Sequence, residues 1–303
     1  MDIKPFENRL KKRAKHLRKK AKSWQTNAYR VYDRDLPEVP FVIDIFNDLV
    51  HLQEFKTSKA DDRTREIIVD CVKDILNLKE EDIAFTLRQR GDGATRYRQR
   101  NDEVKETIMN EGPYQFEIIA GKYVDVGFFP DHRRLRKHVG KIVDASMSVL
   151  NLFAYTGAFS VFAAGSGARV TTVDMSNTYI DWAIRNFELN NIPPSKHRFE
   201  RLDTFKFLKQ EFADGVLYDL IILDPPTFSK SKKMDGDFDV LRDHVAMIEQ
   251  TMRLLKPGGT LYFSTNHRRF TFNHDELEGI EISDKTHSED YPRNTHRSWE
   301  LKK

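Results

Sequence analysis

Residues 149–176, VLNLFAYTGAFSVFAAGSGARVTTVDMS, decide the fold. Their pattern predicts a strand, a turn around Gly157, a helix, and a second strand that ends on Asp174. This is the opening unit of a nucleotide-binding α/β fold. Most of the glycines expected in such a turn are absent, so the kind of ligand it holds must be argued from the other residues.

Strand and helix signals continue to alternate from about residue 127 to the end of the chain. Further strands are predicted in RVTTVD, RFERLD, YDLIILD, TLYFSTN and SWEL, with helices after most of them. Alternation of this kind predicts a mostly parallel sheet covered on both faces. We therefore expect a Rossmann-like α/β domain over residues 127–303, with its ligand at the carboxyl ends of the strands.

Residues 1–126 have a different pattern and predict a small α/β module. The expected elements are strands over 28–33, 41–46 and 49–55, a helix over 58–78, a strand over 83–90, a polar loop over 91–102, and a hairpin over 114–126 that turns at Ala120 and Gly121.

This module begins with a basic amphipathic helix, predicted over residues 6–24. Phe6, Leu10, Leu17, Ala21 and Trp24 form one apolar stripe. Residues 9–22, RLKKRAKHLRKKAK, carry nine Lys or Arg and no acid. A solvated helix face is one interpretation. Contact with a polyanion is the other, and it is favoured because unbalanced like charge repels itself.

Composition narrows the class of protein. A chain of 303 residues with 39% hydrophobic and 32% charged residues predicts a soluble protein of two domains. The single cysteine, Cys71, excludes a disulfide framework and a cysteine-rich zinc site. The most apolar run, 149–165, is too polar and short to span a bilayer, and no signal peptide is visible. We expect a cytoplasmic protein. The scattered histidines show no metal-binding spacing, so we expect no metal.

Polar residues stand at four predicted strand ends, the first of which is NLFAYTG with Asn151, Tyr155, Thr156 and Gly157. Asp174 follows the second strand, where an acid can accept both hydroxyls of a ribose, and Asp203 follows the third, where it can contact adenine. Either acid alone could be a helix N-cap. Asp224 begins DPPTF after the fourth strand, and that motif alone could be a turn. Their shared order and spacing predict a nucleoside site.

The first turn favours a nucleoside without phosphates. A dinucleotide site needs G-x-G-x-x-G to bring a pyrophosphate close to backbone amides, whereas Phe153 and Tyr155 stand where those glycines would be. No P-loop pattern is present. These features favour S-adenosylmethionine.

The motifs NLFAYTGAFSVFAA, VDMS, DPPTFSKSKKM and LLKPGGTLYFSTN resemble the class I methyltransferases that modify large-subunit ribosomal RNA, most closely their guanine-N7 branch. The segments FENRLKKRAKHLRK, YRVYDRDLPE and GFFPDHRRLR extend the resemblance over nearly the whole chain. It implies a mostly parallel seven-stranded sheet, 23S ribosomal RNA as partner, and a second methyltransferase that is fused or separate.

The resemblance and the strand ends together give the expected site residues. The cofactor is expected at Phe129, Asp131, Arg133, Asn151, Phe153, Tyr155, Thr156, Gly157, Asp174, Met175, Asp203, Thr204 and Asp224. The segment carrying Phe129, Asp131, His132 and Arg133 enters only through the resemblance. RNA phosphates are expected at Arg9, Lys12, Lys15, Arg18, Lys19, Lys22, Lys230, Lys232 and Lys233.

The expected reaction is methylation of guanine N7, whose lone pair carries no proton and so needs no general base. Asp224 and the carbonyl of Pro225 would orient the base, and Phe228 either stacks on it or packs into the protein. Guanine-N2 methylation stays an alternative because DPP resembles the amine-methylating motif. Cytosine-C5 chemistry needs a cysteine, and Cys71 lies outside the strand-end motifs. A small-molecule methyltransferase and a non-catalytic RNA-binding protein are the remaining alternatives.

Overall fold

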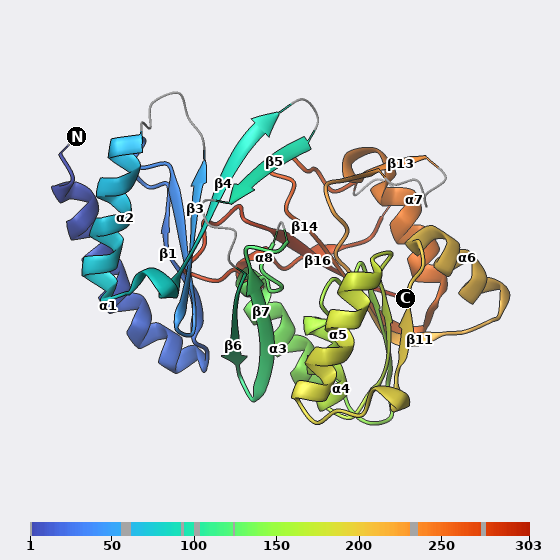
Figure 1. The fold of residues 1–303 in the computed structure, drawn as a ribbon. Helices are drawn as coiled ribbons and strands as arrows, with labels where there is room; N and C mark the ends of the chain where they lie inside the picture. The colour runs from blue at the N-terminus through green and yellow to red at the C-terminus, as the bar shows by residue number, and fades with distance from the viewer. Residues whose placement is uncertain are drawn as a thin grey trace. The chain divides into compact units, whose positions relative to one another are not determined.

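The structure is a computed structural model that describes residues 2–55, 62–91, 94–99, 104–123, 125–230, 236–273 and 277–303. The chain divides into two compact units, Met1–Pro130 and Asp131–Lys303, and Figure 1 follows it from the blue N-terminus to the red C-terminus. A buried hydrophobic cluster lies within each unit.

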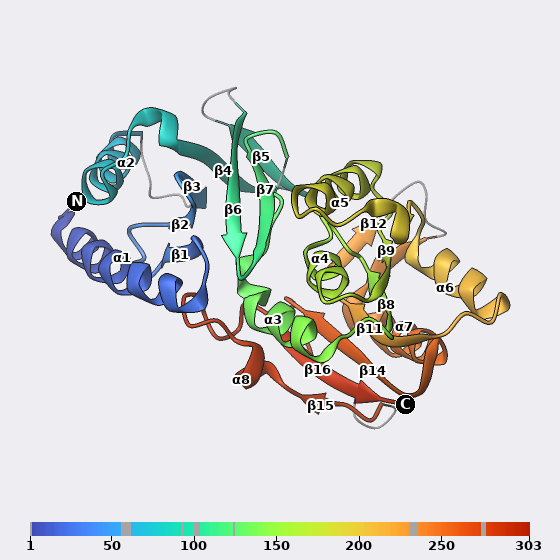
Figure 2. The ribbon, with the colours of Figure 1, turned by 90° about the horizontal axis from the view of Figure 1, so that it is seen from below.

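The first unit packs helices α1 (Lys4–Trp24) and α2 (Asp62–Leu76) side by side, as Figures 1 and 2 both show. Its five-stranded sheet has the order β1-β2-β3-β4-β5. The strands are β1 (Ala28–Asp33), β2 (Phe41–Phe46), β3 (Leu49–Phe55), β4 (Ile83–Gly91) and β5 (Ala94–Gln99). Only the β3–β4 pair among them is parallel, because α2 connects these two strands as a crossover. The predicted apolar stripe of α1 is largely buried: Phe6, Leu10, Leu17 and Ala21 lie in the core.

Two predictions for this unit are wrong. The predicted polar loop over 91–102 contains β5, an edge strand, where charged residues are usual. The predicted hairpin lies further upstream, formed by β6 (Lys105–Glu111) and β7 (Tyr114–Ala120). The hairpin turns at Gly112, whose φ of 60° suits glycine. The predicted turn at Ala120 and Gly121 is therefore wrong. A short 3₁₀ turn, Glu80–Asp82, precedes β4.

The second unit contains a seven-stranded sheet with the order β10-β9-β8-β11-β14-β16-β15. The strands are β8 (Ser148–Leu152), β9 (Arg169–Val173), β10 (Arg198–Glu200), β11 (Tyr218–Leu223), β14 (Leu255–Thr265), β15 (Ile280–Glu281) and β16 (Arg297–Lys302). The first five in this order pair in parallel, whereas β16 is antiparallel to both its neighbours. The predicted mostly parallel Rossmann-like sheet is confirmed.

Alternation along β8 shows which helices cover which face of the sheet. Leu150 and Leu152 enter one cluster with Phe207 of α6 and Met247 of α7, whereas Asn151 between them meets α4 on the opposite face. The helices are α4 (Ala158–Gly165), α5 (Asn177–Leu189), α6 (Thr204–Ala213) and α7 (Val240–Arg253). Strand order reverses between β8 and β11, which is where a doubly wound sheet binds ligands.

Smaller elements complete the second unit: the 3₁₀ turns Pro130–His132 and Pro194–Lys196, helices α3 (Arg133–Ile142) and α8 (Ser283–Thr286), and the paired strands β12 (Phe228–Lys230) and β13 (Asp237–Asp239). Within the described ranges, no helix combines the length and apolar character that a membrane span requires.

Candidate functional site

The turn after β8 follows a glycine-like path although aromatic residues occupy it. Phe153, Tyr155 and Gly157 all have positive φ, at 53°, 51° and 75°. Bulky residues rarely adopt this conformation, and it persists only where the surroundings hold it. The Ala154 N–H donates to the Val173 carbonyl at 2.9 Å, so the turn is tied to the end of β9.

Besides its positive φ, the close approach of α5 requires a glycine at position 157. A Cβ atom at this position would lie 2.8 Å from the Cβ of Ala183 on α5, too close for two carbons. Thr156 beside it is buried, and its carbonyl accepts a hydrogen bond from Asn186 at 2.9 Å. The Tyr155 ring contacts Tyr179 edge to face, with centroids 4.5 Å apart. Packing against α5 thus holds the turn.

Asp174 ends β9 and is fixed by two backbone N–H groups. Tyr155 N–H donates to its Oδ2 and Ser176 N–H to its Oδ1, both at 2.9 Å. It does not cap α5, since Ser176 accepts from Tyr179 N–H as the N-cap. Burial raises the pKa of Asp174, and the two N–H bonds oppose that rise. Each carboxylate oxygen can accept a further hydrogen bond, as a ribose diol requires.

Asp203 has the capping role that the sequence left open. It is the N-cap of α6 and accepts from Lys206 N–H at 3.2 Å. Thr204, the next residue, is buried, and Met175 beside Asp174 is half-buried. Contact of Asp203 with an adenine stays a prediction.

Asp224 follows β11 and meets two other elements. Ser264 at the end of β14 donates from Oγ to Asp224 Oδ1 at 2.5 Å, and His132 Nε2 lies 3.5 Å from Oδ2. Pro225 is buried, while Phe228 on β12 is 51% exposed and therefore not a core residue. Sequence reasoning does not single out Ser264, whose signal is its place at the carboxyl end of the strand beside β11.

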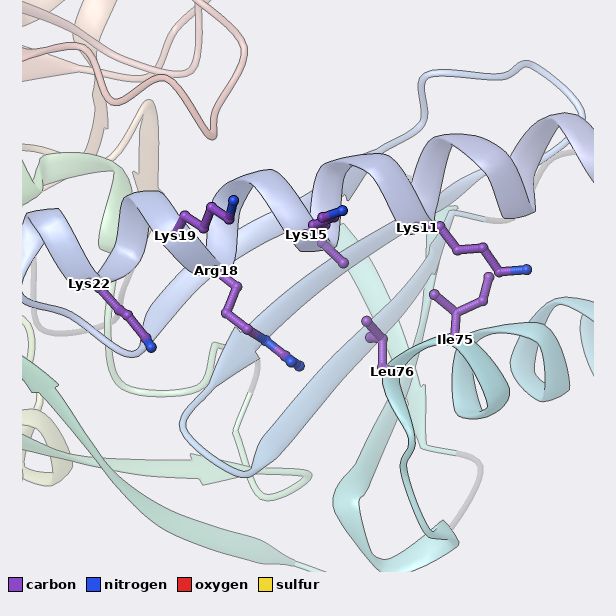
Figure 3. A pocket seen from close by; sticks show the side chains of 8 residues that line it. Lys11, Lys15, Arg18, Lys19, Lys22, Ile75 and Leu76 are labelled. Carbon is purple, nitrogen blue, oxygen red and sulfur yellow. The ribbon is translucent and has the colours of Figure 1, made fainter.

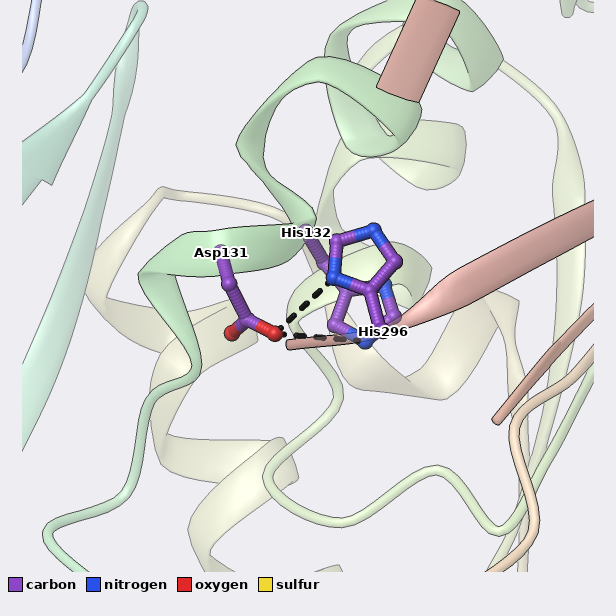
Figure 4. Close-up of side chains that lie close together, drawn as sticks. All are labelled: Asp131, His132 and His296. Atoms are coloured by element: carbon purple, nitrogen blue, oxygen red, sulfur yellow. Dashed lines mark hydrogen bonds and ion pairs between the residues drawn. The ribbon is translucent and has the colours of Figure 1, made fainter. Parts of the chain in front are cut away.

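Asp131, His132 and His296 form a buried cluster in the second unit (Figure 4). His296 Nδ1 lies 3.0 Å from Asp131 Oδ2, and His132 Nε2 lies 3.9 Å from the same oxygen. The two imidazole rings are stacked, with centroids 4.1 Å apart and an angle of 17°. Burial would raise the pKa of Asp131, but the electrostatic influence of His132, which acts as the carboxyl ionises in acid, the hydrogen bond with His296 and the nearby Arg136 outweigh burial and hold that pKa below its usual range.

The residue types of this cluster would suit a divalent metal ion, since their ligand atoms lie within 4.8 Å of one another. The ring arrangement does not. A nitrogen lone pair lies in the plane of its imidazole, so two nearly parallel stacked rings direct their lone pairs into separate planes. We therefore interpret the cluster as a hydrogen-bonded one, and the absence of a metal stays a prediction.

Two predicted cofactor residues have other partners in the structure. The Asn151 amide is buried and donates to Ser160 of α4 at 2.9 Å, inside the interface between sheet and helix. The buried guanidinium of Arg133 pairs with the buried Asp290 at 3.2 and 3.4 Å. The roles of both side chains at the cofactor stay predictions. Phe129, in the first unit, is 43% exposed.

Five basic side chains of α1 line a groove of about 420 Å³ in the first unit. Figure 3 shows them in a row along α1, with Ile75 and Leu76 of α2 beside them. The lining residues are Lys11, Ala14, Lys15, Arg18, Lys19, Lys22, Ile75 and Leu76.

This groove divides the predicted RNA-binding residues into two sets. Lys15, Arg18, Lys19 and Lys22 line it. Lys12 does not, and Arg9 pairs with Asp35 at 3.1 Å. Elsewhere in the chain, Lys230 is exposed at the end of β12, whereas Lys232 and Lys233 lie outside the described residues.

Comparison with known proteins gives consistent matches. A family model described as S-adenosylmethionine-dependent methyltransferase matches residues 60–278. The ribosomal RNA large subunit methyltransferase K of Neisseria meningitidis is 40% identical over 99% of this chain and 88% of its own length. The K/L enzyme of Colwellia psychrerythraea is 39% identical over 98% of this chain and 43% of its own length. The crystal structure of a methyltransferase complexed with SAH superimposes with a TM-score of 0.79 at 23% identity, covering 100% of this chain and 82% of that one.

Proposed function

The chain belongs to the S-adenosylmethionine-dependent methyltransferases of the ribosomal RNA large-subunit K and K/L type, and we propose that it methylates 23S ribosomal RNA at guanine N7. The row of acids at the carboxyl edge of the sheet carries the nucleoside-binding part of this proposal, and the N7 position rests on the resemblance. Asp174 and Asp203 follow β9 and β10, and Asp224 follows β11 across the reversal of strand order. A nucleoside cofactor and a nucleobase can thus share this edge.

The residues around the first turn fit S-adenosylmethionine. The Asp174 carboxylate is held by two N–H groups and keeps capacity for two ribose hydroxyls. We assign the cofactor to Asp174, Met175, Asp203, Thr204 and Asp224, to the turn residues Phe153, Tyr155, Thr156 and Gly157, and, through the resemblance, to Phe129 and Asp131. When bound, this cofactor supplies an electrophilic methyl group on a sulfonium.

The role of the protein in the transfer step is to position the base. In-line displacement requires the attacking nitrogen about 3 Å from the methyl carbon, and alignment supplies much of the rate. Asp224 can accept hydrogen bonds from guanine N–H groups, and the exposed ring of Phe228 is available to stack on a base. N7 carries no proton, so no residue need remove one.

The cytosine-C5 alternative fits the structure poorly. Its nucleophile would have to be Cys71, the one cysteine of the sequence. This side chain is buried on α2 in the first unit, and burial raises its pKa to about 11. A cysteine that acts as a thiolate nucleophile needs a lowered pKa.

The direct test is to incubate the protein with labelled S-adenosylmethionine and unmodified 23S RNA, digest the RNA to nucleosides, and identify the product by mass spectrometry. Label is expected in N7-methylguanosine. Label in N2-methylguanosine would overturn the N7 assignment and recast Asp224 as the group that orients the amine. The chain spans 43% of the K/L relative, so a second methyltransferase, fused or separate, stays a proposal.

We further propose that the α1 groove holds RNA phosphates. Lys15→Glu, inside the groove, is expected to weaken RNA binding several-fold, because it replaces an attractive charge by a repulsive one. It should also reduce the log–log salt slope by about 0.7, the value for one single-strand phosphate. Filter binding across a salt series measures both quantities.

Lys4→Glu is the matched control for this prediction. It makes the same charge change on the same helix, at an exposed residue that does not line the groove. Its affinity and salt slope should stay near wild type. Equal losses in both variants would mean that the whole helix acts by general attraction and that the groove has no particular role.

A further inference from the structure

The two oxygens of the Asp224 carboxylate are held differently. Oδ1 accepts a short hydrogen bond of 2.5 Å from Ser264. Oδ2 faces His132 Nε2 at 3.5 Å, a distance beyond a normal hydrogen bond. Ser264 therefore fixes one oxygen of the carboxylate, and the other oxygen faces the imidazole in a longer, electrostatic contact.

The surroundings of His132 indicate which nitrogen carries its proton. Nε2 faces two carboxylate oxygens, Oδ2 of Asp224 at 3.5 Å and Oδ2 of Asp131 at 3.9 Å. Nδ1 is buried and has no hydrogen-bond partner among the described residues. A lone pair directed at two anions would be repelled, so the proton belongs on Nε2.

The ring of His132 is held from both sides. His296 stacks on it at 4.1 Å and is itself bonded to Asp131 through Nδ1. Phe159 of α4 contacts the ring edge to face, with centroids 5.8 Å apart. Burial, His296 and Arg136 disfavour the imidazolium, whereas Asp224 and Asp131 favour it, and the net effect lowers the pKa of His132. The ring is thus a neutral donor near pH 7.

We propose that His132 is a positioning residue that, locked by His296 and Asp131, sets the Asp224 carboxylate at the angle required to receive the target base. This inference rests on the proposed function, in which Asp224 binds that base. His132 acts through Asp224 and takes no part in bond making. The neutral state matters because an imidazolium would pair with the carboxylate and draw it away from the base.

The test compares three variants in single-turnover methylation of RNA. His132→Leu removes the donor and is expected to lower the rate constant for methyl transfer about 10- to 100-fold, with cofactor Kd unchanged, because small misplacements of reacting groups cost that much. His132→Gln keeps an N–H donor and should recover most of the rate. His138→Gln is the matched control on α3, the helix that follows His132, since the His138 ring bonds Tyr262. It should leave the rate constant for methyl transfer unchanged.

A titration of the His132 ring by NMR gives a readout without activity. Because Asp224 favours the imidazolium, Asp224→Asn is expected to lower the pKa of His132 further. An unchanged titration, or a His132→Leu variant at the wild-type rate, would overturn the inference. If RNA is not methylated but Asp224→Asn still lowers the pKa of His132, the positioning of Asp224 stands and the proposed function fails.

Discussion

Asp224→Asn is expected to lower the rate constant for methyl transfer by about 100-fold or more, while the Kd of the cofactor changes much less. The substitution keeps the size of the side chain. It replaces one acceptor oxygen by an N–H₂ donor, which would face donor groups of the guanine edge. The remaining oxygen can still accept from Ser264, so the fold around β11 and β14 should persist. Single-turnover methylation with saturating RNA measures the effect.

Asp219→Asn provides the matched control for this prediction. Asp219 lies near the amino end of β11, the strand that Asp224 follows, and accepts from Ser148 N–H at 2.7 Å and from Lys256 Nζ at 2.8 Å. Its substitution should lower Tm and leave the rate constant unchanged. A wild-type rate in Asp224→Asn would show that the base is oriented by other groups, and equal losses in both variants would trace the effect to stability.

The parallel strands and the acids at their ends follow from local pattern and topology. Apolar runs mark β8, β9 and β11, and the rule that parallel strands share a carboxyl edge brings Asp174 and Asp224 together. The turn after β8 shows the limit of motif reasoning. Phe153 and Tyr155 occupy positions of glycine-like φ, so the expected shape persists without the expected residues, because hydrogen bonds to β9 hold it.

Partners far apart in the chain could not be predicted. His296 meets Asp131 across 165 positions and Ser264 meets Asp224 across 40. The buried ion pair of Arg133 and Asp290 joins residues 157 positions apart. Local periodicity carries no information on such pairs, because their members come from separate elements that meet only in the folded chain.

Asp174→Ala is expected to raise the Kd of S-adenosylmethionine about 100-fold. The proposed role of the carboxylate is to accept both ribose hydroxyls, and a hydrogen bond to a charged group contributes about 1.5–3 kcal/mol. The substitution also leaves the N–H groups of Tyr155 and Ser176 without their acceptor, which loosens the turn that the cofactor contacts. Isothermal titration calorimetry with the cofactor alone separates this loss from any effect on RNA.

Asp203 supplies the comparison that decides between ribose recognition and loss of structure. Asp203→Ala removes the N-cap of α6 and should cost about 1 kcal/mol of stability. Asp203→Asn keeps a capping oxygen and should cost little stability, so any loss of cofactor affinity in it reports contact with adenine. Suppose that Asp174→Ala lowers Tm at least as much as Asp203→Ala does, and raises the cofactor Kd by no more. Asp174 would then be a structural acid at a strand end. A large rise in Kd with a small change in Tm is the result that the two fixed oxygens of Asp174 predict.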